Sequence, residues 1–527
     1  MENKDFSFAK WKTGAILGFM EKKKGRVAAR PEKPDSAPAA AACEASARAG
    51  SLPWTLTWYV LALLFLALTW YPASKLSAHY SFGSNEGFNT TFAAEAAAGV
   101  PIYGKPPVYS YANYPPVSFH LIAWLSVFTH DVNLTGRWLS FFAYLAIGGL
   151  IAPIVERLSG SWRYAAYSGL CWLIWIPAFD VGRVGLNDPH LLGVAFSLAG
   201  LYCFVRDPES TRWLGISAAV FAVSLFTKQS LVAFPAAVAI QLALTSRRRL
   251  AIWLGTAAAA GAILLLLTLA VDGKYFFDHL MLPRAYYFSD IWSSLGPYLY
   301  FVQVPFVVAV IWACRVTSIG STGFLLWGFP MAHAVGAFYC GGAGAGVNHL
   351  FDAMILTAII VGLALPGVGQ AIEGSRFPRA ALTFVLIVPC FLTSLVVLAR
   401  RLPADLGHNA DEVAQAEAEF TGVSKFLRSQ PGPALCESLL LCYAAGKPVT
   451  YDPFVADQLI RTGKIPQEQV VQLIARRQFA AIQIDWHANE PMQPSPRTRF
   501  PGPVMRALFG SYQLALRSGK YAVFTPR

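Results

Sequence analysis

The sequence predicts an α-helical polytopic membrane protein that carries a soluble C-terminal α/β domain. Only 14% of the 527 residues are charged and 55% are hydrophobic, whereas soluble domains average about 25% charged residues. The apolar residues gather in long runs, and the composition changes at residue 401. Too few charges are present to cover several soluble domains, so the composition excludes a soluble enzyme, a disordered chain and a small disulfide-rich scaffold.

About eleven apolar segments are expected to span the membrane. A spanning helix needs about 20 predominantly apolar residues, so the shorter run at 116–129 is expected to lie at the membrane surface. The stretch 88–99 is expected to form a short amphipathic helix. The expected spans are 54–73, 134–155, 163–181, 190–205, 213–227, 230–245, 250–271, 296–314, 322–340, 349–366 and 380–399.

Basic residues predict the side of the membrane on which each connection lies. Residues 1–50 form a basic, polar segment, which predicts a disordered cytoplasmic tail. If 116–129 does not span, the cluster Arg247–Arg249 falls in a cytoplasmic connection, as the positive-inside rule requires. The first loop, 74–133, then lies outside, and so does the C-terminal domain.

Two domains are expected after the tail: a transmembrane module over 51–400 and an extracytoplasmic α/β domain over 401–527. The second contains a charged helical stretch, DEVAQAEAEFTGVSKFLRS, and the apolar runs FAAIQID and YAVFTP. It is long enough to bury its own core. Cys436 and Cys442 are the close cysteine pair of this polar region, and a disulfide between them requires an oxidising compartment. The spacing leaves that pairing open.

Polar side chains from separate segments gather on the outer face. Because one membrane surface brings these segments together, we expect a site at the outer membrane–water interface. A substrate with a lipid tail and an anionic head group would fit there. The residues are Glu86, Glu95, Arg137, Arg183, Asn187, Asp188, His190, Lys228, Gln229, Arg284, Asn348 and His349.

Each principal candidate has a functional and a structural interpretation. Glu86 is a general base or a solvated loop carboxylate. Asp188 organises a metal ion or phosphate, or it only starts a helix before Pro189. Arg183 pairs with Asp188 or contacts phosphate. Lys228 contacts phosphate or extends towards the membrane surface.

The remaining candidates are more ambiguous. Glu95 is interpreted as structural, and Tyr114 is expected mainly to shape its loop. His190 is a ligand or an interfacial histidine. The run GGAGAGVNHLFDA (341–353) lacks the features of a phosphate-binding P-loop, and its glycines permit a tight turn that leaves Asn348 and His349 at the mouth of the next span.

Several segments, in order, resemble the GT-C superfamily of integral-membrane glycosyltransferases. The resemblance covers about 54–366 and is to the bacterial polyprenyl-phosphate-sugar-dependent branch, which includes lipid A aminoarabinose transferase, rhizobial lipopolysaccharide-core transferases and relatives of protein O-mannosyltransferases. The matching segments are NEGF, AAEAAAGVPIYG, YPPVSFHLIAWL, GRWLSFFAYLAIGG, VGRVGLNDPHLLG, LFTKQSLVAFPAA and GGAGAGVNHLFDA.

The resemblance implies inverting transfer of a hexosyl or pentosyl unit from a polyprenyl-phosphate donor. The acceptor would be a lipid, glycan or protein at the periplasmic face of a bacterial inner membrane. Glu86 would match the first-loop acid, acting as general base, and Asp188 the second-loop acid, which helps to hold a metal, the donor phosphate or the acceptor. Many relatives have Asp or Asp-Glu where this chain has Asn85-Glu86, so the requirement for Mg²⁺ or Mn²⁺ stays open.

The other roles follow the same resemblance. Lys228, with Arg183 and Arg284, is expected to bind the donor phosphate. Tyr114, His190, Asn348 and His349 are expected at the acceptor or sugar site.

Two other classes of function compete with this one. A transporter or lipid-linked sugar flippase would need polar groups across the membrane and often an inverted repeat, and the sequence shows neither pattern. A non-catalytic scaffold would bind cell-wall polymer through the C-terminal domain. The charge of +12 is distributed over the tail, the inner connections and the outer domain, so it gives no argument for nucleic acid.

Overall fold

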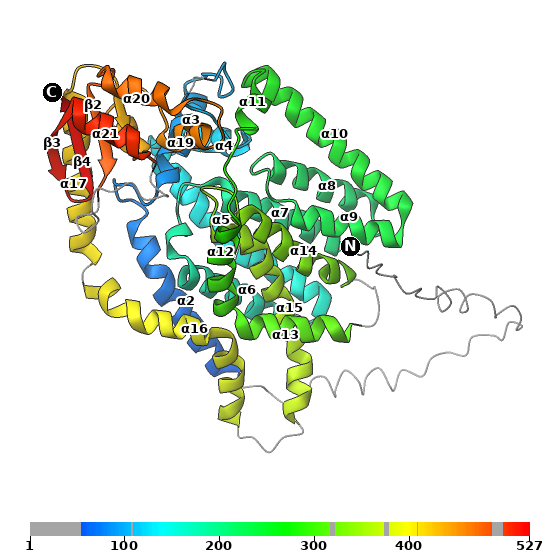
Figure 1. Ribbon diagram of the computed structural model, residues 1–527. Helices are drawn as coiled ribbons and strands as arrows, with labels where there is room; N and C mark the ends of the chain where they lie inside the picture. Colours follow the sequence, from blue (N-terminus) through cyan, green and yellow to red (C-terminus); the bar gives the residue numbers. More distant parts are fainter. Residues whose placement is uncertain (1–53, 107–108, 317–321, 374–378, 408, 487–498) are drawn as a thin grey trace, which may run out of the picture. The chain divides into compact units, whose positions relative to one another are not determined.

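The computed structural model describes residues 54–106, 109–316, 322–373, 379–407, 409–486 and 499–527. The basic tail expected over 1–50 lies outside the described residues. Within the described chain, helices form one bundle, and a small sheet with its own helices lies at the end of the bundle where α3 and α4 are found (Figure 1).

The first part of the described chain is entirely helical apart from its connections. Its helices are α2 (Trp54–Lys75), α3 (Ser84–Ala97), α4 (Val117–Thr129), α5 (Val132–Ser159), α6 (Trp162–Phe179), η1 (Val181–Arg183), α7 (Pro189–Arg206), α8 (Thr211–Leu225), α9 (Ala233–Thr245), α10 (Arg247–Val271), α11 (Phe276–Leu280), α12 (Phe288–Phe301), α13 (Gln303–Arg315), α14 (Gly323–Cys340), η2 (Val347–Leu350), α15 (Phe351–Glu373) and α16 (Arg379–Gly407).

The chain is a multi-pass membrane protein. Within the described residues, 7 helices are long and apolar enough to cross a membrane, namely α2, α5, α7, α10, α14, α15 with η2, and α16. The pair α12 and α13 would make an eighth span, bent by 84°. All eleven expected segments fall on helices, but α8 and α9 have only 15 and 13 residues, so the expected count of eleven stays a prediction.

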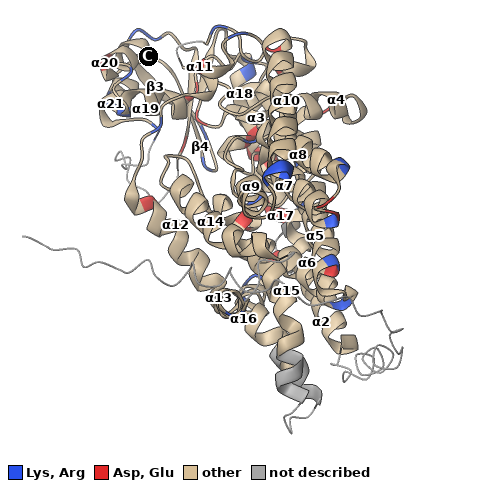
Figure 2. Ribbon diagram, turned by 90° about the vertical axis from the view of Figure 1, so that its right-hand side faces the viewer, with Lys and Arg blue, Asp and Glu red and all other residues tan. Residues whose placement is uncertain are grey.

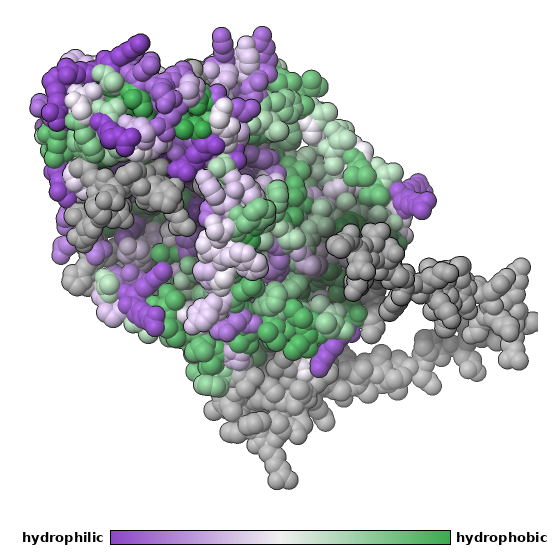
Figure 3. Space-filling model, viewed as in Figure 1, coloured by the Kyte–Doolittle hydropathy of each residue, from purple (hydrophilic) through white to green (hydrophobic). Residues whose placement is uncertain are grey.

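Helix α10 shows why these segments suit lipid. After Arg247–Arg249 it carries no charged residue, and only Trp253 and Thr268 of its side chains are buried by protein. Figure 2 shows the bodies of the long helices in tan, with charged residues mainly at their ends and in the connections. In Figure 3 hydrophobic residues cover the region of α10, while hydrophilic residues gather over the C-terminal sheet. A helix satisfies its own backbone hydrogen bonds and can therefore face hydrocarbon.

Small residues and buried aromatic rings pack the centre of the bundle. A Cβ atom at Gly169 of α6 would lie 2.6 Å from the carbonyl oxygen of Gly148 of α5, so the two helices approach closely only because both residues are glycine. Trp172 is fully buried and donates to the carbonyl of Tyr144 at 3.0 Å. Trp175 donates to the carbonyl of Cys390 at 2.9 Å.

The two surface segments of the first loop are helical. The run at 116–129 becomes α4, whose 13 residues are fewer than the about 20 of a spanning helix, and its place at the membrane surface stays a prediction. The stretch expected to be helical from residue 88 begins earlier, at Ser84, with Gly83 as its N-cap. Glu86 therefore lies in the first turn of α3 rather than in a loop.

The C-terminal part forms a four-stranded sheet with flanking helices, which confirms the expected α/β domain. The sheet order is β1-β2-β4-β3, with β1 and β2 parallel and the other pairs antiparallel. Helix α16 continues beyond residue 400 to Gly407, so the change in composition falls within a helix. The elements are α17 (Asn409–Ser429), β1 (Ala434–Cys436), α18 (Leu439–Ala444), α19 (Pro453–Arg461), α20 (Gln467–Ala475), β2 (Ala481–Asp485), α21 (Gly502–Ser511), β3 (Tyr512–Ser518) and β4 (Tyr521–Pro526).

Two apolar runs account for the central strands of this sheet, which are buried on both faces. The runs FAAIQID and YAVFTP become β2 and β4, which pair from Ile482↔Phe524 to Asp485↔Tyr521. Cys436 and Cys442 form a disulfide between β1 and α18, which answers the question that their spacing left open.

The C-terminal domain packs directly on the first loop. A Cβ at Gly87 of α3 would collide with the backbone of Leu440 in α18, so glycine is required for this close approach. The amide of Asp452 donates to the carbonyl of Tyr109 at 2.8 Å, beside a bridge between Tyr109 and Tyr451. These contacts position the domain over the ends of the helices that carry the candidate site.

Candidate active site at the helix ends

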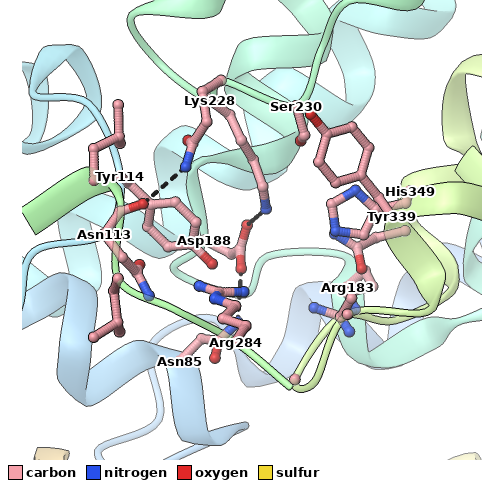
Figure 4. A pocket seen from close by; sticks show the side chains of 17 residues that line it. Asn85, Asn113, Tyr114, Arg183, Asp188, Lys228, Ser230, Arg284, Tyr339 and His349 are labelled. Atoms are coloured by element: carbon pink, nitrogen blue, oxygen red, sulfur yellow. Dashed lines mark hydrogen bonds and ion pairs between the residues drawn. The ribbon is translucent and has the colours of Figure 1, made fainter. Parts of the chain in front are cut away.

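A polar cavity of about 250 Å³ lies where several helix ends and connections meet (Figure 4). Seven of the residues proposed from the sequence line it: Tyr114, Arg183, Asp188, Lys228, Arg284, Asn348 and His349. The lining also includes Gln229, which the sequence grouped with these residues on the outer face, and four polar residues to which it gave no role in the site: Asn85, Asn113, Ser230 and Tyr339. The expected convergence of separate segments on one site is therefore seen in the fold.

Asp188 is the carboxylate of this cavity. It caps α7, with Pro189 in the first turn, and its Oδ1 accepts from the backbone N–H of His190 at 2.8 Å. The helix-start interpretation of Asp-Pro is thus correct, and the same carboxylate also faces the cavity. Its Oδ2 accepts from the amide of Asn85 at 2.9 Å, and Oδ1 accepts from Lys228 Nζ at 3.3 Å. Figure 4 shows Lys228 and Asn85 on opposite sides of Asp188.

Charge around Asp188 keeps it ionised. Burial alone would raise the pKa of the Asp188 carboxyl, but the Lys228 ammonium and then the Arg183 guanidinium hold this pKa below its ordinary value. The pair is nearly inaccessible, with side chains 5% and 6% exposed for Lys228 and Asp188. Asp188 therefore pairs with Lys228 and orients its ammonium group.

Three cationic side chains face this one carboxylate. Lys228 is buried and its ammonium lies 4.9 Å from the centre of the Tyr114 ring, so it points into the cavity instead of extending to the surface. Arg183 donates to Asp180 at 3.2 Å. Arg284 lies over the ring of Phe454 and makes no ion pair within the described residues. The lining therefore carries more cationic than anionic side chains, which favours a bound anion.

The two histidines have different places. His349 lines the cavity and stacks on Tyr339, with ring centres 5.3 Å apart. His190 does not line it. Its ring lies behind His349, with centres 5.5 Å apart, and against Phe351. Since neither ring nitrogen of the buried His190 has a hydrogen-bond partner among the described residues, His190 supports His349 by packing.

Glu86 faces away from the cavity. Successive helical residues point about 100° apart, so Asn85 reaches Asp188 while Glu86 turns towards α5. Both Glu86 oxygens accept from Arg137, at 2.7 and 2.8 Å, and both side chains are almost completely buried. The backbone N–H of Phe82 also donates to Glu86 at 2.7 Å. The residue expected to be the general base is thus covered by a guanidinium.

A hydrogen-bonded amide network holds α3 against the connection that ends in Asp188. Asn89 donates to the carbonyl of Asn187 at 2.8 Å, and Asn187 donates to Thr90 and Asn133 at 3.1 and 3.2 Å. At Gly136 a Cβ would collide with the Asn187 side chain. This network fixes Asn85 relative to Asp188. It also buries Asn89.

The donor set does not fit a divalent cation. Mg²⁺ and Mn²⁺ take several oxygen ligands, yet Asp188 is the single carboxylate among the lining residues, and its oxygens already accept three hydrogen bonds. Within the described residues no three His, Cys, Asp or Glu side chains are grouped to hold a metal. Lys228 occupies the place beside Asp188 that a cation would take.

The chain matches one protein family model and several solved structures. Residues 113–272 match the family model described as dolichyl-phosphate-mannose-protein mannosyltransferase. That segment contains Tyr114, Arg183, Asp188 and Lys228. A comparison with curated protein sequences gives no match.

Solved structures match most of the chain. ArnT from Cupriavidus metallidurans in the apo state has a TM-score of 0.57 at 14% identity, with 89% of this chain and 97% of ArnT covered. The same ArnT bound to undecaprenyl phosphate has a TM-score of 0.56 at 14% identity, with 90% and 98% covered. The chain has the GT-C fold. The apo oligosaccharyltransferase of Archaeoglobus fulgidus, at 10% identity with 83% of this chain and 70% of that protein covered, shares the GT-C fold with a TM-score of 0.53.

Proposed function

We propose that this GT-C protein is a membrane glycosyltransferase that moves a hexosyl or pentosyl unit from a polyprenyl-phosphate donor to a lipid, glycan or protein acceptor. The observation that carries the proposal is the buried Lys228–Asp188 pair in a cavity that Arg183 and Arg284 also line. The solved ArnT bound to undecaprenyl phosphate supports a polyprenyl phosphate as the lipid.

The cationic residues suit the departure of a phosphate. When the bond between the sugar and phosphate breaks, negative charge grows on the phosphate oxygen, and preorganised cations in a poorly hydrated site stabilise it. Asp188 holds one proton of the Lys228 ammonium, and the ammonium has three donors. Lys228 can therefore contact phosphate while it stays fixed.

The remaining lining residues suit the sugar and acceptor. Tyr114, Tyr339 and His349 offer ring faces, while Asn113 and Asn348 offer amide groups for hydroxyls. We assign Glu86 a positioning role, because Arg137 covers its carboxylate and it does not line the cavity. Through the first turn of α3 it fixes the direction of Asn85.

We place the site on the outer face of a bacterial inner membrane, with the N-terminus cytoplasmic and the C-terminal domain periplasmic. The cluster Arg247–Arg249 begins α10 at the end opposite to Asp272, and Arg249 pairs there with Glu209. A basic cluster on that side supports a cytoplasmic location. The Cys436–Cys442 disulfide supports an oxidising compartment for the C-terminal domain.

Mass spectrometry of surface glycolipids, polysaccharides and glycoproteins tests the function. A deletion strain should lose one sugar of defined mass, the wild-type gene should restore it, and Lys228→Gln should not. Lys464→Gln is the matched control, because Lys464 is exposed and outside the cavity. Unchanged surface glycans in the deletion strain, with translocation of a lipid-linked sugar by the purified protein, would establish a flippase instead.

A further inference from the structure

A second cavity of about 80 Å³ continues from the first towards the C-terminal domain. The two cavities share Asn85, Asn113, Tyr114, Arg284 and Gly344 as lining residues. The far wall of the second cavity is formed by Asp452, Phe454 and Arg499 from the C-terminal domain. A molecule in this space would lie between that domain and the first cavity, where we propose that the donor phosphate binds.

Asp452 is fixed in this wall. Its backbone N–H donates to Tyr109 of the first loop, and its Oδ1 accepts from Phe454 N at 2.8 Å as the N-cap of α19. It is only 5% exposed. Gly344 adopts a φ of +75°, and a Cβ there would lie 2.7 Å from the Phe454 ring. The first loop, at Tyr109, and the connection that contains Gly344 therefore both pack on the segment that carries Asp452.

Transfer to a hydroxyl needs a proton acceptor, and the other nearby carboxylates are poorly suited. Asp188 accepts from Asn85, Lys228 and a backbone N–H. Glu86 is covered by Arg137. Burial raises the pKa of the Asp452 carboxyl, although the nearby Arg499 and Arg284 lower it in part. A carboxylate whose pKa is raised towards the working pH is the better base.

We propose that Asp452, supplied by the C-terminal domain, is the general base that takes the acceptor's proton. The proposal rests on the glycosyltransferase function. As the acceptor oxygen bonds to the anomeric carbon, its proton passes to the Asp452 carboxylate. The bond from that carbon to the phosphate oxygen breaks, and polyprenyl phosphate leaves with the electron pair beside Lys228, Arg183 and Arg284. Water then takes the proton from Asp452.

Two substitutions test the charge without removing the helix cap. Asp452→Asn and Asp452→Ser both keep a side chain that can cap α19. The matched control is Asp457→Asn, a buried carboxylate on α19 that pairs with Arg461 and lies outside both cavities. Transfer is measured with the purified full chain in vesicles made from the lipid extract of the deletion strain, which retains the unused donor. Inorganic and undecaprenyl phosphate are the binding probes.

The proposal expects a separation of binding from turnover. Both Asp452 variants should lower kcat by about 10²-fold or more, the usual contribution of a general base. Their affinity for undecaprenyl phosphate should stay within about twofold of wild type, since they retain the phosphate-binding residues. Wild-type turnover should fall at acid pH as Asp452, which lies next to Tyr451, Arg284 and Arg499, is protonated. The residual rate of the Asp452 variants should not show this fall.

The outcomes separate the two proposals. The test uses vesicles in which wild type transfers sugar and Lys228→Gln does not. A normal kcat of Asp452→Asn there overturns the role of Asp452, while the proposed glycosyltransferase function still stands. A loss of turnover that Asp457→Asn shares also overturns it, because the effect is then structural. If wild type transfers no sugar in these vesicles and the surface glycans of the deletion strain are unchanged, the proposed function itself fails.

Discussion

Asn85 donates its amide N–H to Asp188 at 2.9 Å, so an uncharged side chain from α3 faces the carboxylate of the cavity. The amide adds no charge to the site, and it is not a base that could take a proton from the Lys228 ammonium. It leaves Asp188 and three cations as the charged groups lining this space. Asn85, and not the neighbouring Glu86 that the family resemblance indicated, therefore faces Asp188 and keeps this side of the site uncharged.

Asn85→Asp should weaken phosphate binding. Two carboxylates at hydrogen-bond distance repel each other, and the added charge lies in a cavity built for an anion. Affinity for undecaprenyl phosphate should fall by about tenfold, from a coulombic cost of order 1–2 kcal/mol at this range. Thermophoresis in detergent measures it. Asn85→Gln, which adds no charge, is the control, and an equal loss in both variants would show that shape rather than charge matters.

Metal removal should leave the wild-type protein unaffected. The oxygens of Asp188 are already occupied by hydrogen bonds, so sugar transfer in the vesicle assay is expected to be equal with EDTA and with added Mg²⁺ or Mn²⁺. In Asn85→Asp a pair of carboxylates offers oxygen ligands, and Mg²⁺ should partly restore binding. A wild-type rate abolished by EDTA and restored by one cation would refute this.

Lys228→Gln should lose undecaprenyl phosphate binding. The substitution removes the buried ammonium and leaves Asp188 without its closest cation, which brings an uncompensated carboxylate next to the phosphate. Truncating one charged partner of a buried contact costs about 2–5 kcal/mol of binding free energy, so binding should fall by about 30-fold or more. Lys228→Arg should recover part of it. Binding of Lys228→Gln within a few-fold of wild type would exclude Lys228 from the phosphate site.

Glu86→Gln should act on stability. Arg137 would remain buried with one partner removed, at a cost of about 3–5 kcal/mol. Thermal unfolding in detergent should show a lower Tm, and Glu86→Gln combined with Arg137→Met should regain part of it. Turnover of the folded fraction is expected to fall much less than in Asp452→Asn. A stable Glu86→Gln protein with no transfer would instead restore Glu86 as the base.

Glu95 should make stability depend on pH. Burial raises the pKa of Glu95 from 4.5 to about 7 in the folded protein. Its carboxyl therefore binds the proton more tightly when folded, which stabilises the fold below the unfolded pKa and is lost as the pH rises through about 7. Glu95→Gln should thus be more stable than wild type at about pH 8 and similar at about pH 4. Parallel Tm curves for the two proteins across this range would contradict the assignment.

Local patterns in the sequence determined the membrane segments and the strands. A run of apolar residues is helical wherever lipid is its solvent, so every expected span falls on a helix, including α10 with its basic start. The segment NDPH fixed Asp188 as a helix cap, because the cap and its Pro189 are adjacent. The cluster Arg247–Arg249 predicted the membrane side of each connection and, with it, that most candidate site residues share one face; the side itself stays a prediction.

Other features depended on contacts between residues distant in the chain. The first turn of α3 begins at Ser84, and only the packing of that turn decides that Asn85 enters the cavity while Glu86 meets Arg137. Glu86 is next to Asn85 in the sequence, so the pattern could place Glu86 near the site. It could not show in which direction the Glu86 side chain points. The pair α12 and α13 bends by 84° at Val302. Pro305 is a local signal for a break here, because it lacks a backbone N–H and its ring crowds the carbonyl of Phe301, but only packing sets the angle.

The sequence by itself therefore determined a helical membrane protein with a C-terminal α/β domain, and it predicted that a set of basic residues suited to phosphate lies on the outer face. Composition and periodicity act over a few turns of chain, which is why these features could be inferred from them. The tertiary structure alone decided that Asn85 donates to Asp188, that Arg137 covers Glu86, and that Asp452 lines the second cavity. Each is a close contact between distant segments, fixed by packing at glycines such as Gly87 and Gly344.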